Sequence, residues 1–201
     1  ARLAKVRSLK PKAKLRIDVN GSWSVETAIT NLRAIYENIG ELEYVEQPCA
    51  TIDELKRLKD EVRIPLKIAG DEILRKAQDP FKVDLAGAVD ILVIKVQPLG
   101  GIDRANQLAN HYGLPVVVSS ALESAVGINY GLQLAGSIVN LEFDCGLGTG
   151  ALLSKDLGNL PIINGEMAIT KVEPDFAGLE VSPDRYEWWK NRVLETAEKI
   201  K

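Results

Sequence analysis

The chain has 201 residues, of which 46% are hydrophobic and 26% charged, with a formal net charge of −3 at pH 7. Interspersed charges of both signs exclude a basic face for nucleic acid or for an anionic membrane, and the apolar runs are too short to span a bilayer. Cys49 and Cys145 form no C-x-x-C pair, so we expect a reduced, cytoplasmic protein.

Apolar runs alternate with helical patterns along the chain. The first residues are typical of the end of a helix, which Pro11 interrupts. Ser24 can cap a helix that stops at Gly40, and Thr51 opens a capping box for the next one. The strands that the apolar runs predict are 15–18, 42–46, 66–70, 91–95, 115–120 and 141–146.

Polar residues end the first five of these strands at nearly even spacing. Asp18, Glu46, Asp71, Lys95 and Ser119 each follow the previous one by 24 to 28 residues, about the length of a strand, a crossover helix and two loops. Parallel βα units in series form either an eight-fold barrel or a doubly wound sheet. Because no G-x-G-x-x-G follows any strand, the α/β barrel is favoured.

Six strands cannot close an eight-stranded barrel at its usual tilt and shear. We therefore expect that the first strands lie before residue 1 or come from a partner. Residues 1–158 are predicted to form a partial (β/α) barrel domain. An irregular tail starts at Asn159, and Ser182 caps a final helix. We expect this tail, 159–201, to pack on the barrel or on a capping domain.

Three carboxylates, Asp18, Glu46 and Asp71, are predicted to meet at one end of the barrel, where they repel one another unless a cation neutralises them. Oxygen ligands without His or Cys favour Mg²⁺ before Mn²⁺ or Ca²⁺. Lys95, on the next strand, would face this ion. A divalent metal with an ammonium group suits proton abstraction next to a carboxylate, because both stabilise the resulting enediolate.

Each of these residues also has a plain structural interpretation. A single carboxylate at a strand end is as often the cap of the following helix as a ligand, but three at repeat spacing favour a site. Arg16 lies one layer beneath Asp18, and it either buttresses that carboxylate or reaches a substrate anion; we favour the substrate. Lys67 shares the face of Asp71, and we interpret it as part of a structural ion pair.

Six sequence motifs carry a resemblance to a known family. They are Arg16-Ile17-Asp18-Val19-Asn20-Gly21-Ser22-Trp23, Val45-Glu46-Gln47-Pro48-Cys49, Ala69-Gly70-Asp71-Glu72, Lys95-Val96-Gln97-Pro98-Leu99-Gly100-Gly101, Ser119-Ser120-Ala121-Leu122-Glu123-Ser124 and Cys145-Gly146-Leu147-Gly148-Thr149. In these motifs and their order the chain resembles the enolase superfamily and, within it, the o-succinylbenzoate synthases of menaquinone biosynthesis.

The resemblance implies a (β/α)8-type TIM barrel and a function for each matched position. Asp18, Glu46 and Asp71 would be the Mg²⁺ ligands, and Lys95 would stabilise the enediolate. The residues implied to line the pocket for a small carboxylate substrate are Arg16, Asn20, Ser119, Ser120 and Gly146. The implied reaction is a syn dehydration of a cyclohexadiene carboxylate, in which an α-proton and a hydroxyl group leave and an aromatic ring forms.

The chain departs from the family pattern at the catalytic base. In the family the base is a lysine of a Lys-x-Lys pair, which precedes the Asp-x-Asn strand and follows a capping domain. Here Lys5-Val6-Arg7 is the candidate, but its surroundings have a helical pattern. Lys5 also lies just 13 residues before Asp18, barely enough for a crossover connection, so we do not assign Lys5 as the base. We expect the first two strands, the base and the cap to be missing, which would leave the chain weak in metal binding and turnover. The alternatives are an N-acylamino acid racemase or dipeptide epimerase of the same superfamily, and a non-catalytic barrel fragment.

Overall fold

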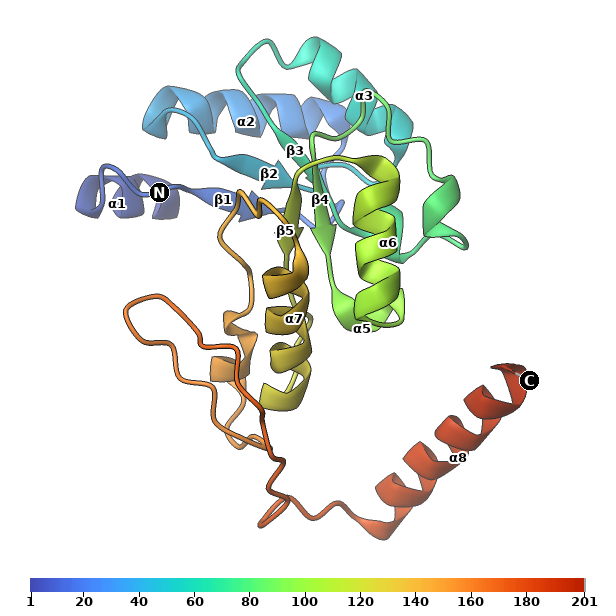
Figure 1. Ribbon diagram of the computed structural model, residues 1–201. Coiled ribbons are helices and arrows are strands. Elements are labelled where there is room, and N and C mark those ends of the chain that lie inside the picture. The colour runs from blue at the N-terminus through green and yellow to red at the C-terminus, as the bar shows by residue number, and fades with distance from the viewer. Residues whose placement is uncertain (201) are drawn as a thin grey trace.

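A single parallel sheet organises the molecule, in the strand order β1-β2-β3-β4-β5 (Figure 1). The computed structural model describes residues 1–200. Each strand is a short, mostly apolar segment that follows a turn, as the sequence pattern predicts. The strands are β1 (Arg16–Asp18), β2 (Tyr44–Glu46), β3 (Ile68–Gly70), β4 (Ile91–Ile94) and β5 (Val116–Val118).

Helices connect successive strands, as in a series of βα units. The predicted caps are confirmed: the Ser24 hydroxyl accepts a hydrogen bond from the Thr27 amide, and Thr51 and Glu54 form a full capping box. The helices are α1 (Arg2–Leu9), α2 (Val25–Ile39), α3 (Ile52–Glu61), α4 (Glu72–Arg75), α5 (Val96–Leu99), α6 (Ile102–Tyr112), α7 (Ala125–Ser137) and α8 (Pro183–Ile200), with 3-10 turns at Pro80–Lys82 and Gly148–Leu152. None of the helices described in residues 1–200 is both long and apolar enough to cross a membrane.

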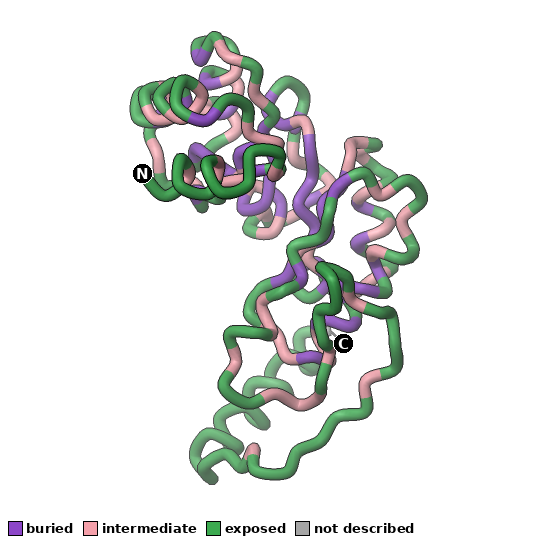
Figure 2. Tube along the Cα trace, turned by 90° about the vertical axis from the view of Figure 1, so that its left-hand side faces the viewer, coloured by how far each residue is buried: buried purple, intermediate pink, exposed green. Residues whose placement is uncertain are grey.

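The two faces of the sheet bury different sets of residues. Because side chains alternate along a strand, one set packs outward against the helices and the other inward. The outward set joins a large core that includes Val45, Leu92 and, from the helices, Leu58 and Leu108. The inward set forms a separate, smaller cluster, made of Tyr44, Ala69, Ile91, Val93, Val117 and Phe143. The purple segments in Figure 2 show how burial concentrates around the sheet.

The sixth predicted strand, 141–146, is wrong. A single parallel bridge joins Ser119 to Gly146, and no further ladder forms in the described chain. The carbonyl of Asp144, which a ladder would use, instead accepts a hydrogen bond from Arg16 Nη1 at 2.7 Å. Only Phe143 of this segment is buried, so little apolar surface holds it as a strand.

The tail beyond residue 158 contributes little to the core. The final helix α8 lies apart from the sheet in Figure 1, and residues 183–199 are all exposed. Its Trp188 and Trp189 rings meet edge to face, with centroids 4.7 Å apart. The division at residue 158 and the docking of the tail remain predictions.

Candidate active site at the carboxyl end of the sheet

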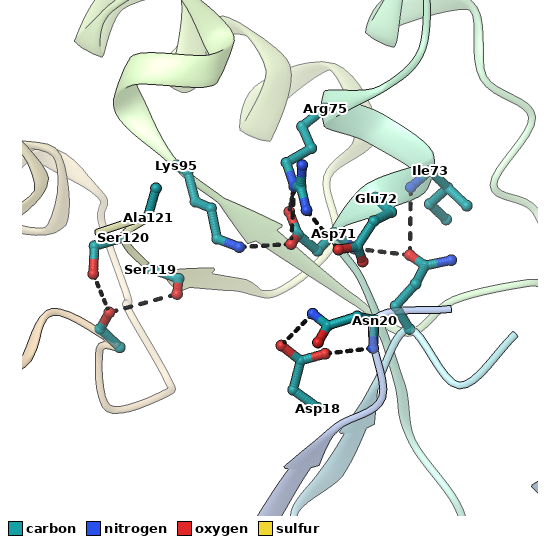
Figure 3. A network of polar contacts seen from close by, with 12 residues as sticks. Asp18, Asn20, Asp71, Glu72, Ile73, Arg75, Lys95, Ser119, Ser120 and Ala121 are labelled. Atoms are coloured by element: carbon teal, nitrogen blue, oxygen red, sulfur yellow. Dashed lines mark hydrogen bonds and ion pairs between the residues drawn. The ribbon is translucent and has the colours of Figure 1, made fainter. Parts of the chain in front are cut away.

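Strand register brings the predicted site residues onto one face and one edge of the sheet. Asp18 lies directly opposite Glu46 in the β1–β2 pair, and Glu46 lies opposite Ala69 in the β2–β3 pair. Asp71, two residues beyond Ala69, therefore shares the face of Glu46, one step nearer the edge. Lys95 likewise follows Ile94, which pairs with Val118, so Lys95 and Ser119 stand side by side. Figure 3 shows Asp18, Asp71, Lys95 and Ser119 at the same edge of the sheet, with the side chain of Lys95 directed toward Asp71.

Asp71 is the most deeply buried acid of this group, with 1% of its surface exposed. Lys95 Nζ lies 2.6 Å from Asp71 Oδ2, and Arg75 Nε donates to Oδ1 and Oδ2 at 3.0 and 3.1 Å (Figure 3). The side chain of Lys95 is itself 12% exposed. Two cations thus pair with this buried carboxylate, which offsets the cost of removing it from water.

Asp18 is held by its own turn. Its Oδ1 accepts a hydrogen bond from the Asn20 backbone amide and its Oδ2 accepts one from Asn20 Nδ2, both at 2.9 Å. Asn20 has a φ of +51°, a left-handed conformation that Asn tolerates better than most residues. Asn20, predicted to line the substrate pocket, therefore orients an acid in this structure (Figure 3).

Glu46 carries the clearest electrostatic signature of the site. Burial, followed by the nearby charge of Asp18, raises the pKa of Glu46 to about 7, while Lys95 acts in the opposite direction. Asp71 and Glu72 raise this pKa further. The carboxylates of the neighbouring strand ends are therefore close enough to repel one another.

Glu72 is a fourth acid at the same edge. It is 6% exposed, and its Oε1 accepts a hydrogen bond from Arg75 Nη2 at 2.5 Å. Its Oε2 is buried without a hydrogen-bond partner, which is costly for a carboxylate oxygen.

The donor set of this site fits a hard divalent cation. Four carboxylates face two cations, Lys95 and Arg75, so two negative charges are left uncompensated when all four acids are ionised. All the atoms that could coordinate a metal here are carboxylate oxygens, and one of them, Glu72 Oε2, has no hydrogen-bond partner. In the described residues 1–200, no three acids yet surround one point closely enough to hold an ion, since Asp18 bonds to Asn20 and Asp71 to Lys95 and Arg75. A bound ion would have to replace some of these contacts.

Ser119, Ser120 and Gly146 lie together beyond Lys95. Ser120 Oγ donates to the Gly146 carbonyl at 2.9 Å, and it also lies 2.9 Å from Thr149 Oγ1. A Cβ at Gly146 would come within 2.9 Å of Ser119 Oγ, so a larger residue there would require the Ser119 hydroxyl to move. The structure brings these three predicted pocket residues into one group, while their role toward a substrate stays a prediction.

Arg16 connects two distant parts of the chain. Its Nε lies 2.5 Å from Glu43 Oε2, its Nη1 reaches the Asp144 carbonyl, and its guanidinium stands 4.8 Å from the Tyr44 ring centre. These structural contacts, one layer beneath Asp18, occupy the hydrogen-bond donors of the Arg16 guanidinium, and its role toward a substrate remains a prediction.

The ion pair predicted for Lys67 is wrong. Within the described chain Lys67 forms no ion pair, and its Nζ lies 5.9 Å from the centre of the Phe143 ring.

Two residues of the site escaped the sequence analysis. Arg75 lies four residues after Asp71, a spacing that pairs side chains on a helix, and this signal was available. The second residue is Gln47, a buried side chain whose Oε1 accepts a hydrogen bond from the Asp71 amide. In the sequence it lies between Glu46 and Pro48, and no pattern there indicates this contact. Lys5, which was left unassigned as a base, is an exposed residue of α1.

A parallel sheet with acids and a lysine at its carboxyl edge is typical of metal-assisted barrel enzymes. Residues 1–186 match the family model described as enolase C-terminal domain-like, and the chain belongs to this family. Among curated proteins, it is similar to an o-succinylbenzoate synthase of Mycobacterium ulcerans (strain Agy99), with 45% identity over 196 residues, covering 96% of this chain and 58% of that protein. An o-succinylbenzoate synthase of Thermobifida fusca (strain YX) is 45% identical over 193 residues, covering 93% and 60%. The chain thus spans about three-fifths of the length of these relatives.

Solved structures give the same fold. The L-Ala-D/L-Glu epimerase from Bacillus subtilis superposes with a TM-score of 0.70 at 26% identity, over 86% of this chain and 49% of that chain. A muconate cycloisomerase variant superposes with a TM-score of 0.74 at 23% identity, over 88% and 52%, which shows the fold alone. The predicted barrel-type α/β fold of the enolase superfamily is confirmed, with five strands of it present in the described chain.

Proposed function

We propose that this chain provides the metal-binding and electrophilic side of an o-succinylbenzoate synthase, a lyase that converts 2-succinyl-6-hydroxy-2,4-cyclohexadiene-1-carboxylate to o-succinylbenzoate in menaquinone biosynthesis. Curated relatives with this name, 45% identical to the chain, support the proposal. The observation that carries it is the Lys95 ammonium, 2.6 Å from Asp71, in a group of acids that comes from successive strand ends. In the proposed reaction the Lys95 ammonium would stabilise the enediolate.

Asp18, Glu46 and Asp71 would hold Mg²⁺, with Mn²⁺ as the alternative ion. When bound, the ion would supply positive charge to the substrate carboxylate and to the enediolate formed from it. The uncompensated negative charge of the site and the unpartnered Glu72 Oε2 support this assignment. Asn20, which bonds to both oxygens of Asp18, would exchange part of this contact for the ion and would line the substrate pocket.

Lys95 would act on the substrate as an electrophile. In the proposed reaction the C–H bond next to the carboxylate breaks, its proton passes to a base, and the electron pair moves toward the carboxylate. The return of this pair breaks the C–O bond, and the departing hydroxyl group takes up a proton from the same acid–base group to leave as water. The Lys95 ammonium is largely shielded from solvent, so its attraction for the developing negative charge is stronger than in water. Ser119, Ser120, Gly146 and Arg16 would complete the pocket for the carboxylate substrate. We assign the proton acceptor to none of the described residues.

An epimerase or racemase acting on dipeptides or N-acylamino acids is the second candidate. The likeness to the L-Ala-D/L-Glu epimerase, at a TM-score of 0.70 and 26% identity, favours it. Both reactions begin with the loss of a proton next to a carboxylate, so the site described above suits both.

The test is a direct comparison of the two reactions in the full-length polypeptide with Mg²⁺. Aromatic ring formation from the cyclohexadiene carboxylate is followed by absorbance, and epimerisation of L-Ala-L-Glu and of an N-acylamino acid by α-proton exchange. We expect dehydration to have the higher kcat/KM. Faster epimerisation would assign the second function, and Mg²⁺ binding without either reaction would support a non-catalytic barrel.

A further inference from the structure

Gln47 follows Glu46 at the end of β2, and its side chain is fully buried, at 0% exposure. Its Nε2 donates to the Cys49 carbonyl at 2.9 Å. Its Oε1 accepts hydrogen bonds from the Asp71 amide at 3.1 Å and from the Ile73 amide at 3.4 Å. One amide group therefore connects the strand end that carries Glu46 with the strand end that carries Asp71.

The backbone of Gln47 reaches the other two strand ends. Its N–H donates to the Ala69 carbonyl at 2.9 Å, and its carbonyl accepts the Gly21 N–H at 2.7 Å, just beyond the Asp18 turn. Gln47 has a φ of +37°, a left-handed conformation that is rare for a residue with a side chain. Such conformations persist only where the surrounding contacts enforce them, and they gather at functional sites.

The Gly21 turn packs closely on this residue. A Cβ at Gly21, whose φ is +70°, would lie 3.3 Å from Ala50 Cα and 3.6 Å from Gln47 Cγ. Next along the chain, the Trp23 amide donates to the Pro48 carbonyl at 3.2 Å. The turn after β1 and the turn after β2 therefore form one packed unit around Gln47.

We propose that Gln47 is a positioning residue that fixes the three acid-bearing strand ends relative to one another. This inference rests on the proposed function, since it concerns the acids assigned to Mg²⁺. Gln47 itself would touch neither metal nor substrate. Its effect would come from holding the loops after β1, β2 and β3 at a fixed separation, so that Asp18, Glu46 and Asp71 reach one ion through changes in their side-chain contacts alone.

The amide is the group that these contacts require. Glutamate keeps the acceptor for the Asp71 and Ile73 amides but cannot donate to the Cys49 carbonyl when ionised, and it adds a charge among the acids. Methionine fills a similar volume and makes neither contact, which leaves buried backbone groups unpaired. Asparagine is one methylene shorter and cannot span the same gap.

The test uses the full-length polypeptide and three variants: Gln47→Met, Gln47→Asn and, as the matched control, Leu58→Ala. Leu58 is fully buried in α3 and belongs to the large core, so its loss lowers stability without touching the site. Mn²⁺ affinity is measured by electron paramagnetic resonance, and amide hydrogen exchange is measured in metal-free protein. Melting temperature confirms that each variant is folded.

We expect both Gln47 variants to bind Mn²⁺ at least about tenfold more weakly, the range seen for residues that orient metal ligands. Their faster amide exchange should be confined to Gly21, Asp71 and Ile73. Leu58→Ala should lower the melting temperature and leave the Mn²⁺ affinity unchanged. If Gln47→Met does not fold, the Mn²⁺ affinity of Gln47→Asn decides the test.

Two results are distinguishable as failures. Wild-type affinity in a folded Gln47 variant would reduce Gln47 to a packing role and overturn the inference alone. Failure of the wild-type protein to bind Mn²⁺ or Mg²⁺ would overturn the proposed function, and the positioning of metal ligands with it.

Discussion

The outer face of the sheet and its carboxyl edge are built from opposite kinds of residue. The outer face buries Val45, Leu92, Leu58 and their neighbours in one apolar core, where removal of apolar surface from water stabilises the folded state. Within residues 1–200, the edge gathers four acids, among them Asp71 and the half-buried Glu46, and pairs them with two cations, Lys95 and Arg75. The outer face therefore stabilises the fold by apolar burial, whereas the edge holds closely spaced like charges, and we propose that it binds a cation. Substitutions on the two regions should therefore separate stability from metal binding.

Asp71→Asn should give the largest functional loss, because it removes a buried charge that both cations and the proposed ion need. We expect Mg²⁺ affinity to fall by more than about 100-fold, beyond the loss found for residues that only orient ligands. Activity should be abolished. Calorimetric Mg²⁺ titration of the full-length protein measures this, with the exposed Asp60→Asn as control. Equal affinity in wild type and Asp71→Asn would rule out this ligand.

Leu108→Ala should cause the largest loss of stability among the substitutions in the outer-face core. Leu108 is fully buried in α6, so its truncation should cost about 2–5 kcal/mol of unfolding free energy. Urea unfolding measures this cost, and the Mg²⁺ affinity of the folded variant should not change. A large loss of affinity would mean that core and edge are coupled.

Lys95→Ala should lower kcat by about 100-fold or more, the range for removal of one group that stabilises a developing anion. Mg²⁺ binding should persist, because the three proposed acidic ligands remain and one cation that pairs with Asp71 is removed. Steady-state kinetics and calorimetry on the same preparation separate the two effects. Loss of Mg²⁺ binding with Lys95 would make it a structural partner of Asp71.

The pKa of Glu46, raised to about 7 by burial and then by Asp18, predicts a pH dependence at the edge. Because the folded protein holds this proton above the usual pKa of 4.5, the metal-free protein should lose stability as pH rises from 4.5 through 7. Mg²⁺ competes with that proton, so its stabilising effect should grow over the same window and level off above it. Melting curves with and without Mg²⁺ measure this difference, and Glu46→Gln should abolish it.

Thr51→Ala should have the smallest effect, since it removes only the capping box of α3 on the outer face. We expect a loss of about 1 kcal/mol in unfolding free energy. Mg²⁺ affinity should stay at the wild-type value. A Thr51→Ser variant, which keeps the hydroxyl, serves as control and should restore most of the stability.

Sequence reasoning found those parts of the molecule that periodicity and local caps determine. The five strands, the caps at Ser24 and Thr51, and the convergence of strand ends follow from apolar spacing and short-range hydrogen bonds. The segment 141–146 was misassigned because its alternation resembles a strand, while the Arg16 contact that takes up its backbone comes from 128 residues away. The role of Gln47 was invisible for the same reason: it depends on a left-handed backbone and on partners from three loops.

The placement of the three tryptophans has a spectroscopic consequence. Trp188 and Trp189 are about half exposed on α8, so their fluorescence should be red-shifted, and their edge-to-face pair should give an exciton signal in far-ultraviolet circular dichroism. Trp23 instead packs against the core and bonds to the loop after β2. The blue-shifted fluorescence of Trp23 would report on the loops around Gln47. Trp23 and the Trp188–Trp189 pair are therefore separate intrinsic probes of the acid-bearing edge and of the final helix.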